Sequence, residues 1–424
     1  MTAIPLISTS PSIHEVRKVY CEIQVKAIDA AAGKFLLKNK QLFSDLTKFD
    51  IVYTITNDGE EISKGQLDRA LFEKLAPLSE MEFGVDYNLS EMPAGEVIIT
   101  FSFIRREACR FAEAGYEQGW DQFIIKGADK KAEAVYENKV DIKGTDTSFT
   151  VIGDTFNYTF SDGLLVSIEK DGKEYLSGAL KPNYYRALTD NDIDYLNFVP
   201  PLIPFHPLYH WRRATNMLKT KATLIHRYSH TAYIETTVSV MGMKDVKMTY
   251  TVYPDGKIDV THKGTPQMDM VRFGSVLTMA REFDQVKWYG RGPHENYIDR
   301  QSGARIAMHE MSVTDMEHHY MRPQENGHRI DVRMMEVENA DGEGLRFTQL
   351  GDKPFAINCH HYTINELDDA THIHKLKHKD FTTVCIDLMQ RGIGGDTPGN
   401  ACLREPNIMH RGTKYDYGFT IEVI

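Results

Sequence analysis

The stretch Trp288-Tyr-Gly-Arg-Gly-Pro-His-Glu-Asn-Tyr-Ile-Asp-Arg300 decides how the fold of this chain is interpreted. Two glycines and a proline stand inside a run of aromatic and charged residues, which is too polar for an ordinary core strand and too aromatic for a featureless loop. Two interpretations follow from the residues alone. Either the stretch faces a ligand, or it is a strand end in which Glu295, Asp299 and Arg300 form a half-buried ion-pair network.

The composition sets the class of protein. The chain has 424 residues, 42% of them hydrophobic, which is enough for two or three domains with their own cores. Its net charge of -11 argues against binding to nucleic acid or to an anionic membrane. It has no apolar run of about 18 residues and no secretory signal pattern, so we expect a soluble, cytoplasmic protein. Five widely spaced cysteines without a Cys-x-x-Cys pair indicate reduced thiols.

The turn signals predict an all-β chain with two sandwiches joined by a linker. Residues 1–12 are rich in small residues and proline and are expected to form an arm. Residues 13–126 contain short strands and a hairpin signal at Asn57-Asp58-Gly59, which predicts an immunoglobulin-like β-sandwich. Residues 127–140 are charged and poor in apolar side chains, as linkers are. Hairpin patterns then continue through residues 141–424 and predict a large antiparallel sandwich.

A second polar stretch, Arg186-Ala-Leu-Thr-Asp-Asn-Asp192, follows the aromatic pair Tyr184-Tyr185. The proline-rich residues 198–209 come after it and predict a long, stiff excursion from the sheet. Long ordered excursions tend to be functional. The alternative is a solvated connection whose aspartates only cap the turn.

Motifs for self-contained chemistry are missing from the sequence. It has no Gly-x-Ser-x-Gly elbow, no Gly-x-x-x-x-Gly-Lys and no His-Glu-x-x-His, and the half fingerprint at Gly392-Ile-Gly-Gly395 is not followed by a helical pattern. Histidines cluster twice, and alternation predicts that His372 and His374 share one strand face. Metal ligation is an alternative, although satisfied or exposed histidines are commoner. The two clusters are His318, His319 and His328, and His372, His374 and His378.

Four motifs in a fixed order carry a resemblance to a known family. They are Tyr185-Arg-Ala-Leu-Thr-Asp-Asn-Asp192, the opening stretch, Arg322-Pro-Gln-Glu-Asn-Gly327 and Gly392-Ile-Gly-Gly-Asp396. Together they resemble the C-terminal domain of glycoside hydrolase family 2 β-galactosidases. The sandwich ending in Ala114-Gly-Tyr-Glu-Gln-Gly-Trp120 is similar to the immunoglobulin-like domain that follows the barrel of these enzymes. The resemblance implies a large antiparallel super-sandwich, similar to galactose mutarotase, for the second domain.

The resemblance also implies a protein that breaks no bond by itself. The nucleophile and the acid/base glutamate of the family lie in a (β/α)8 barrel, which needs about 250 residues of alternating strands and helices. This sequence shows no such alternation, so we expect no catalytic residue in it. We expect the non-catalytic C-terminal portion or small subunit of a β-galactosidase, which hydrolyses terminal β-galactosides such as lactose only when it is joined to the barrel-bearing chain.

The expected partners are therefore a barrel-bearing β-galactosidase chain and carbohydrate, with homo-oligomerisation left open. The resemblance does not decide between a separate subunit and a fragment of a longer chain. No cofactor is expected in this chain, whereas Mg²⁺ and Na⁺ are the candidates for the full enzyme. The residues expected at the mouth of the barrel's site, or in carbohydrate binding, are Arg186, Asp190, Asn191, Asp192, His294, Glu295, Glu325, Asn326 and Asp396.

One position departs from the family pattern. In the family, the Gly-Gly-Asp turn commonly leads to a tryptophan that stacks on the aglycone sugar, and this chain has Gly399 there. Because aromatic stacking supplies much of sugar recognition, acceptor binding is expected to be weaker, differently placed or lost.

The resemblance shifts the interpretation of Glu295, Asp299 and Arg300 towards a scaffold that fixes loops facing the barrel. Two alternatives remain. The first is a free-standing carbohydrate-binding or mutarotase-like protein with His294, Glu295 and Glu325 as acid/base groups. The second is a structural oligomerisation module.

Overall fold

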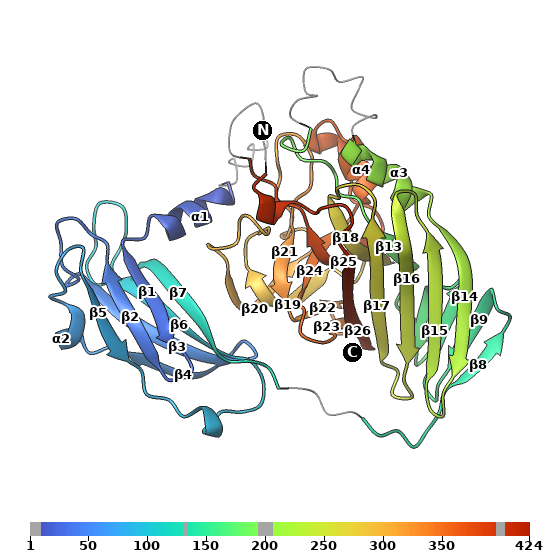
Figure 1. The fold of residues 1–424 in the computed structure, drawn as a ribbon, viewed down its shortest axis with the longest axis horizontal. Coiled ribbons are helices and arrows are strands. Elements are labelled where there is room, and N and C mark those ends of the chain that lie inside the picture. The colour runs from blue at the N-terminus through green and yellow to red at the C-terminus, as the bar shows by residue number, and fades with distance from the viewer. Residues whose placement is uncertain (1–9, 130–133, 194–206, 396–402) are drawn as a thin grey trace. The chain divides into compact units, whose positions relative to one another are not determined.

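The computed structural model describes residues 10–129, 134–193, 207–395 and 403–424 (Figure 1). The chain divides into two compact units, which we describe separately. The small unit contains Thr9–Glu133 and Ser302–Met308, and the large unit contains Ala134–Gln301 and His309–Ile424. No helix within the described ranges is long and apolar enough to cross a membrane.

The small unit is built from two antiparallel sheets. One sheet has the order β1-β2-β5, and the other has the order β4-β3-β6-β7. Their strands are β1 (Ile23–Asp29), β2 (Lys34–Asn39), β3 (Phe49–Asn57), β4 (Glu60–Gln66), β5 (Glu80–Gly84), β6 (Val97–Arg105) and β7 (Glu117–Lys126). The predicted hairpin at Asn57-Asp58-Gly59 joins β3 to β4, and both Asp58 and Gly59 have positive φ there. The buried rings of Phe35 and Phe101 meet edge to face, with centroids 4.8 Å apart, in the core between the sheets.

One helix of the small unit corrects the sequence analysis. The arm was expected to end at residue 12 and a region of short strands to follow it, but residues 12–19 form helix α1 (Ser12–Val19). Glu15 in its first turn and Arg17 and Lys18 in its last turn complement the helix dipole. No residue of α1 is buried. Its eight residues are fewer than the about 11 to 18 over which helical periodicity can be recognised in a sequence. The small unit also contains the single-turn helix α2 (Arg69–Phe72).

The large unit contains three antiparallel sheets, as its alternating pattern predicts. The first five-stranded sheet runs in the order β12 (Lys173–Glu174), β11 (Leu164–Lys170), β10 (Phe156–Ser161), β9 (Ser148–Ile152) and β8 (Asp141–Gly144). The second runs in the order β13 (Gly178–Asn183), β18 (Arg272–Ala280), β25 (Phe381–Gln390), β24 (Phe355–His360) and β21 (Arg329–Val332). We call this second sheet the central sheet.

A nine-stranded sheet completes the large unit, although residues 305–308 of its last strand are counted with the small unit. Its order is β14 (Lys219–Arg227), β15 (Ala232–Ser239), β16 (Met243–Val252), β17 (Ile258–Pro266), β26 (Tyr415–Val423), β23 (Gly344–Gln349), β22 (Met334–Glu338), β19 (Gln285–Gly292) and β20 (Arg305–Ser312). Buried and half-buried residues alternate strictly along β15, because successive side chains of a strand point to opposite faces. One hydrophobic core joins the sheets, and in it Phe273 of β18 stacks on Tyr415 of β26 with ring centroids 5.2 Å apart.

Short helices interrupt the β pattern where the sequence analysis expected strands or loops. Helices α3 (His210–Asn216) and α4 (Ile364–Asp369) lie beside each other (Figure 1), because Arg212 of α3 bonds to Asp368 and Asp369 of α4. Short 3₁₀ turns occupy Leu89–Glu91, Pro207–Tyr209, Ile373–Lys375 and Glu405–Asn407. Because residues 373–375 form a 3₁₀ turn, the prediction that His372 and His374 share one face of a strand is wrong. Residues 194–206 of the predicted excursion lie outside the described residues.

Candidate functional site

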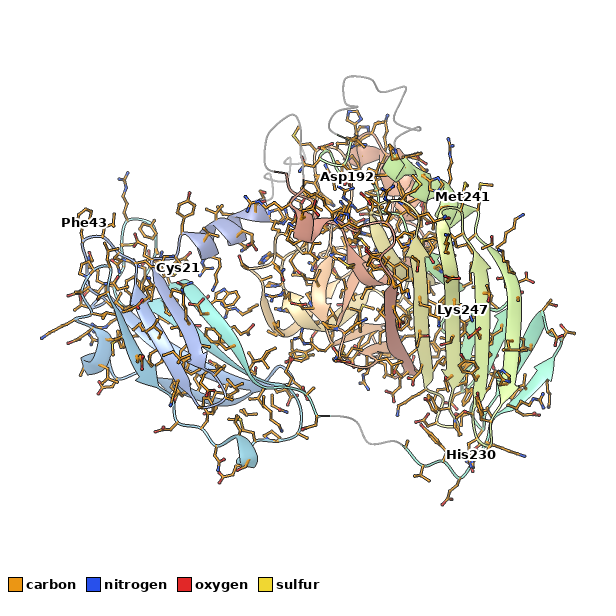
Figure 2. The ribbon with its side chains drawn as sticks, in the orientation of Figure 1. Cys21, Phe43, Asp192, His230, Met241 and Lys247 are labelled. Carbon is orange, nitrogen blue, oxygen red and sulfur yellow. The ribbon has the colours of Figure 1, made fainter. Side chains whose placement is uncertain are left out.

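Strand ends of the central sheet carry three of the four motifs, and the fourth motif follows from β19 of the nine-stranded sheet. The stretch Arg186–Asp192 follows β13, Gly392–Gly395 follows β25, and Arg322–Gly327 precedes β21, while the opening stretch leaves β19 at Gly292. Figure 2 marks the position of Asp192 in the large unit. Beneath these loops lie buried polar side chains that we call the polar core, namely Arg186, Asp192, Arg272, Glu325, Asn358, Asp387 and Gln390.

The first motif forms a buried ion pair that closes its own turn. The side chains of Arg186 and Asp192 are 0% and 3% exposed, and Nη2 of Arg186 lies 3.0 Å from Oδ2 of Asp192. The backbone N–H of Thr189 donates to Asp192, and the N–H of Asp192 donates to the Thr189 hydroxyl. Burial alone would raise the pKa of Asp192, but the guanidinium groups of Arg186 and Arg391 outweigh it and lower that pKa. The pair is therefore charged and sealed from solvent.

Glu325 of the third motif is buried among the strand residues of the central sheet. Its Oε1 accepts hydrogen bonds from Asn358 Nδ2 at 2.7 Å and from Gln390 Nε2 at 2.9 Å. Nearby, Arg272 donates from Nη2 to Oδ2 of Asp387 at 2.6 Å. Burial raises the pKa of both Glu325 and Asp387, while Arg272 acts in the opposite direction. Both carboxylates are thus held inside the fold and face no open site.

The opening stretch is joined to the third motif through Glu295. This carboxylate accepts the backbone N–H of Gly327 at 2.8 Å and also bonds to Arg300 and to the Tyr320 hydroxyl. Asn326, also buried, accepts the N–H of His318 at 3.1 Å. The backbone of the half-buried His294 accepts a bond from Asn296.

Arg329 also joins the opening stretch to the third motif. It donates to the carbonyl oxygens of Pro293, Met316 and Gly327 at distances between 2.6 and 3.1 Å. Burial lowers the pKa of Arg329 to about 10. A guanidinium has five donors in a planar fork, which allows one side chain to fix three separate pieces of backbone.

The exposed part of the site is a rim above the polar core. Asp190, 56% exposed, accepts hydrogen bonds from Arg322 at 3.0 Å and from Gln324 at 3.1 Å. The exposed Asn191 donates from Nδ2 to the carbonyl of Ile393 at 2.6 Å. Asp299 accepts the backbone N–H groups of Ile393 and Gly394. Asp396, the remaining candidate residue, and Gly399 lie outside the described residues.

The structure therefore brings the candidate residues together but buries most of them. Arg186, Asp192, Glu295, Glu325 and Asn326 are buried. Asp190 and Asn191 reach solvent, and His294 is half-buried. The sequence analysis missed the strand members of the polar core. A signal for two of them exists, because Arg272 and Asp387 are the single charged residues of their strands and such charges are rarely buried without a partner.

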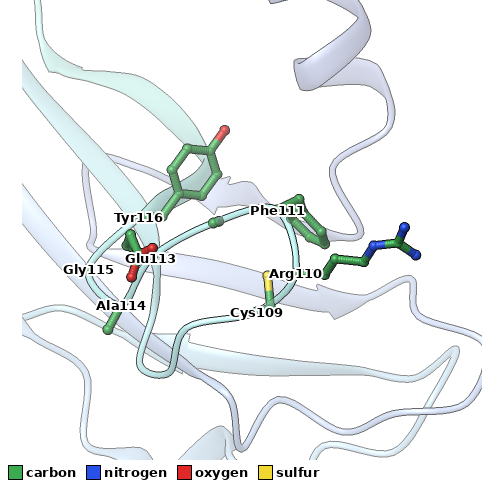
Figure 3. A pocket seen from close by; sticks show the side chains of 8 residues that line it. Cys109, Arg110, Phe111, Glu113, Ala114, Gly115 and Tyr116 are labelled. Carbon is green, nitrogen blue, oxygen red and sulfur yellow. The ribbon is translucent and has the colours of Figure 1, made fainter.

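The mutarotase-like alternative needs a histidine and a carboxylate that face one pocket. Glu295 and Glu325 do not meet this requirement, because both carboxylates are enclosed by the hydrogen bonds given above. A shallow pocket in the small unit is lined by residues 109–116, with Glu113 but no histidine (Figure 3).

The histidine clusters form no metal centre in the described part of the chain. That part holds no group of three or more His, Cys, Asp or Glu side chains arranged to bind a metal ion. Burial lowers the pKa of His328 to about 3, so this imidazole is neutral at physiological pH. His372 and His374 are exposed.

The fold and the polar core define an all-β protein in which the motif residues hold loops instead of forming an exposed acid–base pair. A family model described as "Beta galactosidase small chain" matches residues 152–421, and a model described as "Beta-galactosidase, domain 4" matches residues 35–126. The chain belongs to the β-galactosidase small-chain family. The family membership and the all-β, antiparallel fold that we expected from the sequence are confirmed.

Individual relatives agree with the family match. A β-galactosidase of Priestia megaterium is 31% identical over 429 residues, which cover 98% of this chain and 40% of that protein. A β-galactosidase of Halalkalibacterium halodurans is 28% identical over 428 residues, which cover 97% of this chain and 40% of that protein. The chain thus spans about two fifths of the length of these relatives.

A solved structure of a galactose mutarotase related enzyme from Lactobacillus acidophilus aligns with a TM-score of 0.36 and 9% sequence identity, covering 66% of this chain and 97% of that chain. A similarity of this size carries no argument about function.

Proposed function

We propose that this chain is the non-catalytic small subunit or C-terminal portion of a β-galactosidase and that it completes or stabilises the active site of a barrel-bearing chain. One observation carries the proposal. The motif carboxylates Asp192, Glu295 and Glu325 are each bound by buried donors of the same chain. Retaining hydrolysis of a glycoside needs two carboxyl groups about 5 to 5.5 Å apart on either side of the scissile bond. The three motif carboxylates instead bind donors inside the fold, so we nominate none of them as a catalytic group.

The test is co-expression with a barrel-bearing chain from the same source. We expect a stable complex that hydrolyses a chromogenic β-galactoside, whereas the pure chain leaves the substrate intact. Turnover by the pure chain that disappears when one of its own carboxylates is replaced would overturn the proposal. The natural substrate class that we propose for the complex is terminal β-galactosides such as lactose.

The rim is the part of this chain that we propose to face carbohydrate in the complex. Asp190 and Asn191 are its exposed polar side chains. Calorimetry of the pure chain with galactose and with lactose separates two cases. Heat of binding would favour a free-standing carbohydrate-binding protein. If no heat is measured but the complex with the barrel-bearing chain forms, the rim binds carbohydrate only within that complex.

We also propose that the protein works in the cytoplasm, since the four cysteines in the described residues are free. Any need for Mg²⁺ or Na⁺ is proposed to belong to the assembled protein. Removal of Mg²⁺ with a chelator, or replacement of Na⁺ by K⁺, should then reduce the activity of the complex without changing the unfolding of the pure chain.

A further inference from the structure

Asp299 stands at a place where two of the motifs meet. It lies in the tight turn Tyr297–Arg300, which is closed by two backbone hydrogen bonds of 3.0 and 2.8 Å. Its Oδ2 accepts the N–H of Ile393 at 3.0 Å and the N–H of Gly394 at 2.8 Å. One half-buried carboxylate thus holds two successive amide groups of a distant segment. We call this segment, residues 391–394, the rim turn.

The carbonyl groups of the rim turn are held by the first motif. Arg186 donates to the carbonyl of Arg391 at 2.6 Å and to the carbonyl of Gly392 at 2.9 Å. Asn191 donates to the carbonyl of Ile393. Side chains of two other motifs therefore bind backbone groups at all four positions of the rim turn, with Asp299 on the N–H groups and the first motif on the carbonyls.

The glycines of the rim turn fit this arrangement sterically. A Cβ atom added at Gly392 would lie 2.4 Å from Oδ2 of Asp299 and 3.0 Å from Cβ of Asn407, and one added at Gly394 would lie 3.2 Å from the same Oδ2. Neither glycine has a positive φ. The close approach of the Asp299 carboxylate, and not an unusual backbone conformation, is what excludes a side chain at Gly392.

We infer that Asp299 is a positioning residue that fixes the rim turn, and that the fixed turn sets how well the assembled enzyme binds its β-galactoside. The second half of this inference rests on the proposed function. Asp299 itself is assigned no contact with the reacting atoms. Its effect passes through the backbone of Ile393 and Gly394.

Hydrogen exchange of the pure chain tests the first half. Asp299→Ala is expected to speed amide exchange at Ile393 and Gly394 by about tenfold or more, because each amide loses a hydrogen bond to a charged acceptor. Asp299→Asn, which keeps one acceptor oxygen, should give an intermediate rate. Asp315→Ala is the matched control, since that carboxylate bonds only to Ser312 in its own loop. Unchanged exchange at both amides in Asp299→Ala would overturn the inference.

A double-mutant cycle measures the same contact in another way. Gly392→Ala is expected to shift the urea midpoint of the parent chain clearly downwards. In the Asp299→Ala background the same substitution should shift it much less, because the two nearest atoms, both in the Asp299 carboxylate, are then gone. Equal shifts in both backgrounds would show that Asp299 does not crowd the rim turn.

The assembled enzyme tests the second half. With the barrel-bearing chain present, Asp299→Ala should raise KM severalfold while kcat changes little, and Asp299→Asn should restore part of the loss. A wild-type KM in a variant whose rim turn exchanges faster would refute the link to substrate binding. If the wild-type chain forms no complex, the proposed function fails, and the exchange result still decides whether Asp299 positions the turn.

Discussion

Replacement of Arg186 by methionine should show how strongly the polar core holds the fold. The substitution leaves the carboxylate of Asp192 buried without its main partner, and loss of one partner of a buried pair costs about 3–5 kcal/mol. Arg391 stays nearby, with Nε 3.7 Å from Oδ1 of Asp192, but methionine also removes the donor to the carbonyls of Arg391 and Gly392. We therefore expect a loss of about 3–5 kcal/mol. Urea unfolding at pH 7, followed by circular dichroism, measures this change in the free energy of unfolding.

The pH dependence and a second variant give this prediction its controls. The pKa of folded Asp192 is lowered from its ordinary value of 3.8, so its ion pair contributes stability above that value and loses it as the pH falls through the folded pKa. The cost of Arg186→Met should therefore shrink below about pH 4. The double variant Arg186→Met, Asp192→Asn should be more stable than Arg186→Met alone, because residue 192 then no longer carries a buried negative charge without its main partner. A cost under about 1 kcal/mol at pH 7, where a buried pair predicts several, or a double variant no better than the single one, would refute the reasoning.

Two further substitutions test other parts of the molecule. Burial raises the pKa of Glu317 from 4.5 to about 7, so the folded state binds more protons than the unfolded state between these pH values and loses stability as the pH rises through them. Glu317→Gln should therefore stabilise the chain by up to about 3 kcal/mol at pH 8 and by almost nothing at pH 4. Equal effects on the free energy of unfolding in urea at both pH values would contradict this. Phe35→Ala should destabilise the small unit by about 3–5 kcal/mol, because the Phe35 ring is fully buried against Phe83, Phe101 and Phe123. Calorimetric unfolding measures this loss. Phe43→Ala is the matched control, because the Phe43 side chain is exposed.

Local patterns predicted the sheets because strands and tight turns have short-range causes. The hairpin at Asn57-Asp58-Gly59 follows from the ease with which Asp and Gly adopt positive φ. The alternation along β15 follows from one buried and one half-buried face. Helix α1 was not predicted, because eight residues are too short a stretch for helical periodicity to be recognised.

The burial of the candidate residues could not be predicted in the same way. Glu325 finds its donors at Asn358 and Gln390, 33 and 65 residues further along the chain. Arg272 and Asp387 are 115 residues apart. Whether a motif carboxylate faces a ligand or a distant strand depends on such pairings, and these are set by the sheet order and not by the motif itself.

The polar core is a costly way to fill the space beneath the loops, because buried charges lose their hydration and an apolar cluster of equal volume is often as stable. Apolar side chains, however, cannot bind backbone carbonyl and amide groups. Arg186 of the polar core bonds to two carbonyls of the rim turn. Arg329, a buried arginine outside the polar core, bonds in the same way to three carbonyls of the neighbouring loops. We therefore interpret the polar core as holding the loops in one arrangement at some expense of stability. The proposed function needs such an arrangement, because a small subunit that completes the site of a barrel-bearing chain has to present a fixed surface to it.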